Sequence, residues 1–187
     1  CSGRVNGGGS SGGDGGAGGD GGGPGGGGDT LRSRTSPELP VIGAAVSVSA
    51  LADEPAYGEI AGREFNSITP ENAMKWETVH PTERDWNFGP ADRLVEFAAA
   101  HRMRVHGHTL VWHRQLSDWL TPALTPRAVA RALAAHIDTL VGRYAGRVPA
   151  WDVVNEAIAD GGGLRDTYFL HACGASYIAE AFRLAHA

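Results

Sequence analysis

Residues 149–156 read PAWDVVNE, a short apolar run that ends in an asparagine and a glutamate. Apolar runs of this length with β-branched residues are typical of a buried strand. Side chains alternate along a strand, so Asp152 and Glu156 share one side and Asn155 points to the other. Partial desolvation behind such a run raises the pKa of a carboxyl, which suits a general acid near neutral pH. The stretch predicts either a functional acid or a solvated glutamate at a helix start.

Strand-like and helix-like segments alternate along the chain around this stretch. Strands are predicted at 41–48, 65–69 and 103–112, where apolar and β-branched residues run together. Helices are predicted at 53–65, 90–102 and 125–146, and helical segments at 164–173 and 175–187 close the chain. Leu94, Phe97 and Ala98 share one face of the helix at 90–102. The resulting order is β-α-β-α-β-α-β-α.

Capping residues delimit two of these helices. Asp53 is the expected N-cap of the first helix, and Pro55 lies in its first turn. Thr125 is the expected N-cap of the long helix, with Pro126 at its first position and Gly146 just past its end.

The alternation predicts an α/β fold with a parallel sheet, either open and doubly wound or closed as a barrel. Residues 46–53, VSVSALAD, contain neither a G-x-G-x-x-G turn nor a P-loop, which disfavours a nucleotide-binding sheet. Polar residues gather where the later strands end, and in a barrel those ends form one catalytic face. A barrel takes ~250 residues. We therefore predict a (β/α)8 TIM barrel truncated to about its first four β/α units.

Composition divides the chain into two parts. Residues 3–28 hold 17 of the 28 glycines, mixed with serine and aspartate, which predicts a flexible tether over 1–29 and a folded domain over 30–187. The net charge of −5 does not indicate the basic surface that nucleic-acid binding requires. No apolar run reaches the roughly 18–20 residues of a membrane span.

The two cysteines, Cys1 and Cys173, give neither a disulfide framework nor a clustered metal site. Cys173 is expected to be a small buried residue. Cys1, followed by Ser-Gly and the glycine-rich segment, resembles the mature N-terminus of a bacterial lipoprotein, in which acyl chains hold the cysteine at a bilayer. This predicts a secreted protein with an optional lipid anchor. The alternative is that residue 1 is only where a fragment begins.

The stretch VHGHTLVWH, residues 105–113, places His106 and His108 two apart on a strand, so both face the same way. Such a pair can bind a metal, but no ligand set of carboxylates or cysteines lies nearby in the sequence, so a hydrogen-bonded pair is favoured. Trp112 and Gln115 follow closely, together with His113 and Trp119. Indole faces stack on sugar rings and neutral polar groups bond hydroxyls, which favours carbohydrate over phosphate.

The stretch ENAMKWE, residues 71–77, contains Lys75, the only lysine in the chain. It opens the loop after the second strand, beside Glu71 and Asn72. An ammonium is a compact donor on a flexible stem, whereas a guanidinium is a wide planar fork. A small donor between sugar hydroxyls and a carboxylate would explain the choice, and a solvated polar turn is the alternative.

Together, FNSITPENAMKWE, HGHTLVWH followed by Gln-Leu and a tryptophan, and WDVVNEAI resemble the endo-1,4-β-xylanases of glycoside hydrolase family 10. The resemblance covers roughly residues 40–187, with three long motifs in order. It implies a (β/α)8 barrel, retaining hydrolysis of internal β-1,4-xylosidic bonds in xylan, and no metal or organic cofactor. The expected partner is xylan or a xylo-oligosaccharide, and the full-length protein is expected to be a secreted monomer.

The resemblance also implies a role for each matching residue. Glu156 corresponds to the general acid/base, and Asn155 to the group that bonds the 2-hydroxyl of the cleaved sugar. Lys75, His108 and Trp112 correspond to contacts with that same sugar. The remaining matches, to the next sugar on the non-reducing side, are Glu71, Asn72 and Gln115.

One part of the family pattern is missing. A retaining glycosidase needs two carboxyls ~5–5.5 Å apart, and the family's nucleophile is a glutamate on the seventh strand. Four predicted strands cannot supply it, so this chain alone is expected to be inactive, with exposed apolar faces and poor solubility. The alternative is a tethered xylan-binding protein without catalysis.

Overall fold

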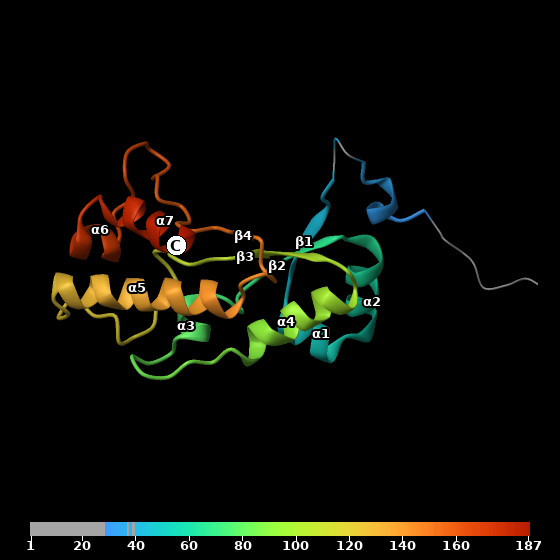
Figure 1. Ribbon diagram of the computed structural model, residues 1–187, viewed down its shortest axis with the longest axis horizontal. Helices are drawn as coiled ribbons and strands as arrows, with labels where there is room; N and C mark the ends of the chain where they lie inside the picture. The colour runs from blue at the N-terminus through green and yellow to red at the C-terminus, as the bar shows by residue number, and fades with distance from the viewer. Residues whose placement is uncertain (1–28, 37, 39) are drawn as a thin grey trace, which may run out of the picture.

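The structure, a computed structural model, describes residues 29–36, 38 and 40–187 (Figure 1). Cys1 and nearly all of the predicted tether lie outside the described residues, so the lipid anchor and the tether stay predictions. The first secondary-structure element is a 3-10 helix, η1 (Leu31–Arg34). The strands are β1 (Gly43–Val46), β2 (Ser67–Pro70), β3 (Arg104–Gly107) and β4 (Ala150–Trp151). The helices are α1 (Val48–Asp53), α2 (Pro55–Glu64), α3 (Trp76–Val79), α4 (Gly89–Ala100), α5 (Pro126–Arg143), α6 (Tyr168–Cys173) and α7 (Tyr177–His186).

In the described part of the chain, the strands form one parallel sheet in the order β1-β2-β3-β4. Gly43 pairs with Ser67 across β1 and β2, and Gly107 pairs with Trp151 across β3 and β4. Sequential parallel strands joined by helical crossovers are the repeating β/α unit of a barrel. Helices α4 and α5 lie along one face of the sheet (Figure 1). The predicted alternation of parallel strands with helical crossovers is therefore confirmed, whereas the short helices α1 and α3 were not predicted.

Two details of the first unit differ from the prediction. The strand predicted at 41–48 is β1 alone, and the chain turns at once into α1, which the sequence did not indicate. The hydroxyl of Ser47 caps α1 by accepting from the amide of Ala50. Asp53, predicted as an N-cap, is instead the last residue of α1, and Glu54 caps α2 without a side-chain hydrogen bond. Pro55 does lie in the first turn of α2, as predicted.

The long helix α5 begins as its sequence predicts and ends at Arg143, a little earlier than predicted. The hydroxyl of Thr125 accepts from the amide of Ala128 at 3.2 Å, and Pro126 is the first helical residue. Gly146 takes a φ of 74° just past the end, a conformation that favours glycine. On α4, Leu94 and Ala98 are fully buried.

The fourth strand is shorter than predicted, but its pairing continues beyond Trp151. Val154 forms an isolated parallel bridge with Val111, and the amide of Asn155 donates to the carbonyl of Val111 at 2.8 Å. Residues 149–156 therefore run beside 106–111 in an interrupted ladder. This places Asn155 and Glu156 at the carboxyl end of the sheet, next to the loop that follows β3.

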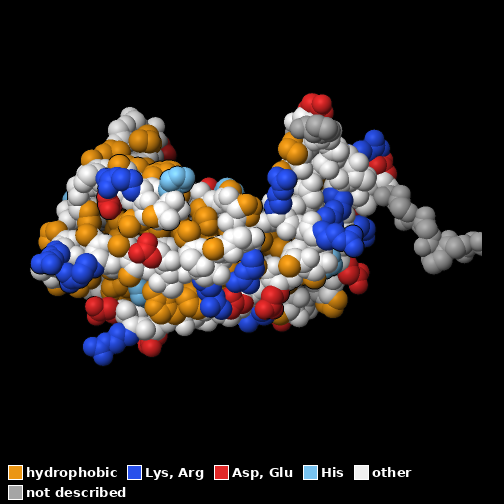
Figure 2. All heavy atoms as spheres, viewed as in Figure 1, with side chains coloured by type: hydrophobic (Ala, Val, Ile, Leu, Met, Phe, Trp, Pro, Cys, Tyr) orange, Lys and Arg blue, Asp and Glu red, His pale blue; other side chains and the backbone are white. Residues whose placement is uncertain are grey.

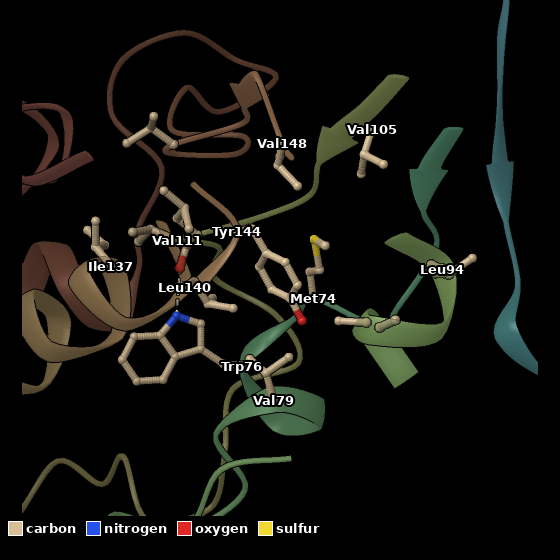
Figure 3. Close-up of a cluster of buried hydrophobic side chains, with 14 of the residues drawn as sticks. Met74, Trp76, Val79, Leu94, Val105, Val111, Ile137, Leu140, Tyr144 and Val148 are labelled. Carbon is tan, nitrogen blue, oxygen red and sulfur yellow. Dashed lines mark hydrogen bonds between the residues drawn. The ribbon is translucent and has the colours of Figure 1, made fainter. Parts of the chain in front are cut away.

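The core lies where the loop after β2 meets α5 and the loop after β3 (Figure 3). Trp76 is 2% exposed, and its indole N–H donates to the carbonyl of Leu110 at 2.7 Å. The ring of His136 on α5 stacks on Trp76 with centroids 3.8 Å apart. Trp76 therefore fixes the residue beside it, Lys75, against the strand end that carries His108.

The opposite face of the sheet is open. Figure 2 shows the molecule hollowed on one side, and the strands lie at the floor of that hollow in Figure 1. Ile158 and Phe182 are both more than half exposed.

Cys173 is only partly buried, less than expected, and its burial raises the pKa of the thiol. None of the described helices combines the length and apolar character that crossing a membrane requires.

Candidate active site

The candidate site is built from the segments that follow β2, β3 and β4. Parallel strands bring their carboxyl ends to one edge of a sheet, so residues far apart in sequence meet there. Lys75 comes from the first segment, Trp112 from the second and Glu156 from the third. Contacts between these side chains define the site.

Glu156 is held by Trp112 and by the backbone of its own loop. The indole N–H of Trp112 donates to Oε2 of Glu156 at 3.0 Å, and Nδ1 of His113 lies 3.7 Å from the same oxygen. Glu156 has a φ of 53°, which costs a residue with a side chain about 1–2 kcal/mol. The guanidinium of Arg165 donates to its carbonyl at 3.0 Å and so holds this turn.

The carboxyl of Glu156 is only partly covered. Its side chain keeps 47% of its accessible surface. Glu156 lies beyond the end of the interrupted ladder, where fewer residues pack against it. The imidazole of His113 is the more buried partner, and burial lowers the pKa of that ring.

Lys75 lies at the centre of the site and is only 8% exposed. Its ammonium donates to Oδ1 of Asn72 at 2.9 Å and lies 4.7 Å from the centroid of the Trp112 ring. Burial lowers the pKa of Lys75, and the charges of Glu71, Glu77 and Glu156 act against that shift. The lone lysine is therefore a buried donor among carboxylates rather than part of a solvated turn.

Gln115 joins the loop after β3 to the loop after β2. Its amide nitrogen donates to Oδ1 of Asn72 at 3.2 Å and to Oε1 of Glu77 at 2.7 Å. The backbone amide of Glu77 donates in turn to the carbonyl of Gln115 at 3.0 Å. Sequence reasoning missed Glu77, although it ends the same ENAMKWE stretch. Through its hydrogen bond with the Gln115 amide, Glu77 fixes the orientation of that side chain.

His106 and His108 face the same way, as the strand pattern predicts, and both meet Asp152. Nε2 of His106 lies 2.8 Å from Oδ1 of Asp152, and Nδ1 of His108 lies 2.9 Å from Oδ2. Burial pushes the pKa of Asp152 up, but the hydrogen bonds and charges of the two histidines outweigh it, and the pKa is lowered overall. No group of three or more acidic, histidine or cysteine side chains in the described ranges could hold a metal ion.

The structure thus links most of the predicted site residues directly. Asn72, Lys75, Gln115, Trp112 and Glu156 form one chain of contacts, and the ring of His108 lies 6.3 Å from that of Trp112.

The side chains of Glu71 and Asn155 make no direct contact of this kind with the other site residues. Glu71 is exposed and reaches the others through its charge on Lys75. The side chain of Asn155, half-buried, makes no hydrogen bond to another described residue, although its backbone is fixed beside Val111. Trp119, considered for sugar stacking, belongs to the core instead. Its indole N–H donates to the carbonyl of His80 at 3.0 Å.

A carboxyl, a buried lysine and an indole at the carboxyl ends of neighbouring β/α strands are features of (β/α)8-barrel glycoside hydrolases, the class to which this fold and site correspond. The profile of glycosyl hydrolase family 10 matches residues 31–187, and the chain belongs to that family. Its four β/α units are therefore units of a (β/α)8 barrel, as the sequence predicted.

Xylanases are among the proteins to which this chain is similar. Endo-1,4-β-xylanase B of Thermotoga neapolitana is 47% identical over 132 residues, which is 70% of this chain and 38% of that protein. Endo-1,4-β-xylanase B of Paenibacillus barcinonensis is 45% identical over 152 residues, 78% of this chain and 45% of that protein. The crystal structure of xylanase 10B from Thermotoga petrophila RKU-1 in complex with xylobiose is 45% identical, with a TM-score of 0.79 over 84% of this chain and 49% of that one. The chain thus spans less than half the length of these relatives.

Proposed function

We propose that this chain carries the acid/base half of an endo-1,4-β-xylanase site. The observation that carries the proposal is the junction of Trp112 with both Lys75 and Glu156, because it joins a sugar-stacking face, a cation and a carboxyl at one strand edge. The relatives support the substrate class, since one of the similar structures is a xylanase in complex with xylobiose. Xylan is a polymer outside cells, so the proposed substrate also suits a secreted protein.

In this proposal Glu156 is the general acid/base. Its protonated carboxyl hands a proton to the glycosidic oxygen as the bond breaks, and its carboxylate later takes one from water. Lys75, His108 and Asn155 bond the hydroxyls of the cleaved sugar, and Trp112 forms part of its wall. Contacts to the next sugar come from Glu71, Asn72 and Gln115. None of these roles calls for a metal or an organic cofactor.

Retaining hydrolysis also requires a nucleophilic carboxylate ~5–5.5 Å from the acid. Asp152 is occupied by two histidines, and Glu77 orients Gln115. Glu71 lies with the contacts proposed for a neighbouring sugar. We therefore assign the nucleophile to no residue of this sequence, and we propose that these 187 residues bind xylo-oligosaccharides but do not cleave them.

Complementation tests the proposal. The chain is mixed with the part of xylanase 10B from Thermotoga petrophila that this chain does not cover, which is about half of that protein, and association is confirmed by size-exclusion chromatography. We call the resulting complex the complemented barrel. Xylan hydrolysis, measured as released reducing sugar, is expected from the complemented barrel and from neither half alone. A matched mixture in which this chain carries Glu156→Ala should have lost it.

Two results would contradict the proposal. Hydrolysis by the isolated 187 residues would mean that a nucleophile lies among them. A well-formed complemented barrel that binds xylotriose but releases no sugar would instead favour a xylan-binding protein without catalysis.

A further inference from the structure

One carboxylate lies between two histidines of the same strand end. Oδ1 of Asp152 faces Nε2 of His106 at 2.8 Å, and Oδ2 faces Nδ1 of His108 at 2.9 Å. The two histidines thus use different ring nitrogens toward one acid. His106 lies two residues before His108 on the same strand, so the two rings approach Asp152 from different distances along the strand. The ring of His106 reaches the carboxylate with Nε2, and the ring of His108 reaches it with Nδ1.

The backbone of Asp152 is fixed as firmly as its side chain. Its amide donates to the carbonyl of Gly107 at 2.9 Å. Its carbonyl accepts from the hydroxyl of Thr109 at 2.8 Å and from the amide of Leu110 at 3.0 Å. These bonds attach residue 152 to the segment that carries both imidazoles. The carboxylate therefore keeps its place relative to both rings.

An ionised carboxylate can only accept hydrogen bonds, so each nitrogen that faces it must carry a proton. The net lowering of the pKa of Asp152 keeps that carboxylate ionised at neutral pH. For neutral imidazoles the result is the Nε2–H tautomer of His106 and the Nδ1–H tautomer of His108. The remaining nitrogen of His108, Nε2, then presents a lone pair.

We propose that Asp152 is a positioning residue that sets opposite tautomers on His106 and His108, so that His108 offers its Nε2 to the ligand as a hydrogen-bond acceptor. This inference rests on the proposed function for the identity of the ligand, a hydroxyl of a xylose unit. The tautomers themselves do not depend on it.

The consequence is that one position of the site accepts a hydrogen bond from the ligand and does not donate one. A hydroxyl that meets the lone pair of His108 must donate its proton, and it then has its oxygen free to accept from a donor such as Lys75. If His108 were protonated or carried its proton on Nε2, it would donate instead. The hydroxyl oxygen would then accept from both His108 and Lys75, and the hydroxyl proton would have no acceptor in this pair. A fixed tautomer therefore fixes the direction of hydrogen bonding around the sugar.

Nitrogen-15 NMR of the histidine side chains reads the tautomers directly. The 187-residue chain is labelled with 15N-histidine, and His106→Gln and His108→Gln variants assign the two rings. We expect His106 as Nε2–H and His108 as Nδ1–H without any sugar present. Solid-state spectra give the same reading if the chain associates. The opposite assignment for His108, or a doubly protonated ring, would overturn the inference.

Asp152→Asn tests the cause. An amide offers one acceptor oxygen and one donor nitrogen, so it cannot accept from both rings. The histidine that faces the amide N–H must present a lone pair, so at least one histidine should change its tautomer. The buried indole N–H resonance of Trp76 reports whether the fold is kept. Asp92→Asn is the matched control, since Asp92 is likewise bonded to two side chains, Arg143 and Tyr144, but on the outer helices. Unchanged tautomers in Asp152→Asn would refute the role of Asp152.

Sugar binding separates this inference from the proposed function. Xylotriose added to the labelled chain should shift Nε2 of His108 more than either nitrogen of His106. If the tautomers are as expected but no sugar shifts them, the positioning role holds and the proposed ligand is wrong. If sugar binds while His108 carries its proton on Nε2, the proposed function stands and the inference fails.

Discussion

The indole nitrogen of Trp112 donates a hydrogen bond to Oε2 of Glu156 at 3.0 Å, while the ammonium of Lys75 lies 4.7 Å from the centroid of the same ring. An indole has an electron-rich face and an electron-poor N–H edge, so one ring stabilises a cation and an anion at once. The cation is thereby held over the face of the ring and the carboxyl at its N–H edge. Under the proposed function, a sugar ring that stacks there would meet the acid and the ammonium in fixed positions.

Trp112→Phe removes the N–H and keeps an aromatic face. A hydrogen bond to a charged group contributes about 1.5–3 kcal/mol, and exposure of the carboxyl places this one at the lower end. We expect kcat/KM of the complemented barrel on xylan to fall about tenfold. Trp86→Phe is the control, because Trp86 stacks on His80 and not at the site. Equal losses in both variants would deny Trp112 a specific role.

Glu156→Ala in the complemented barrel should affect substrates unequally. Xylan has a poor leaving group that needs a proton, and general acid catalysis contributes typically 10²–10⁴-fold. An aryl xylobioside with an acidic phenol leaves without that help, so the bond-breaking step should slow far less. The measurement is the initial rate on both substrates. Equal losses on both would count against the acid role.

Lys75→Arg should weaken the site although the charge is kept. Lys75 is nearly buried between Asn72 and Trp112, and a planar guanidinium is both wider and differently directed. We expect xylotriose affinity to fall about tenfold, ~1.4 kcal/mol, by NMR titration. Arg131→Lys at an exposed position of α5 is the reverse exchange and should change nothing. An unchanged affinity in Lys75→Arg would make the single lysine an accident of composition.

The sequence predicts the strands and the longer helices because the spacing of apolar residues within each segment is enough to indicate them. It also predicts which residues meet, since carboxyl ends of parallel strands share one edge. It does not predict α1, because a serine hydroxyl turns an apolar, valine-containing run into a short helix. The degree of exposure of Glu156, 47% of its side chain, also depends on what packs over the strand end, which the local sequence does not show. The link from Asp152 to both histidines joins residues more than 40 positions apart, and no local pattern shows it.

Gly107 and Gly142 form a matched pair for stability. A Cβ on Gly107 would lie 2.2 Å from the Trp151 ring, so Gly107→Ala must displace that ring and disturb the packing of β4 on β3. Overpacking of this kind typically costs 1–3 kcal/mol, at times more. Gly142 lies in α5 with nothing within 4 Å of a new Cβ, and Gly142→Ala should stabilise by about 0.5–1 kcal/mol. Urea unfolding measures both. A Gly107→Ala chain of unchanged stability would mean that β4 is not held against β3.

The buried His136 should make the free energy of unfolding depend on pH. Its ring is fully buried, and its Nε2 has no hydrogen-bond partner among the described residues. Burial, and then the charge of His80, hold the pKa of His136 well below its usual range. In the unfolded chain the ring titrates near ~6.5. Below that pH the unfolded state binds a proton that the folded state does not, so stability falls as the pH falls.

The loss from His136 should approach ~1.4 kcal/mol per pH unit and be absent above about pH 7.5. His80, whose pKa burial also lowers, acts in the same direction and the same window. Asp92 and Asp152, with lowered pKa values, lose their contribution only at lower pH, so urea midpoints between pH 7.5 and 5.5 isolate the histidines. His136→Phe keeps a ring against Trp76 and should remove most of this slope. His186→Phe, at an exposed position, should not, and an equal slope in both variants would contradict the assignment to His136.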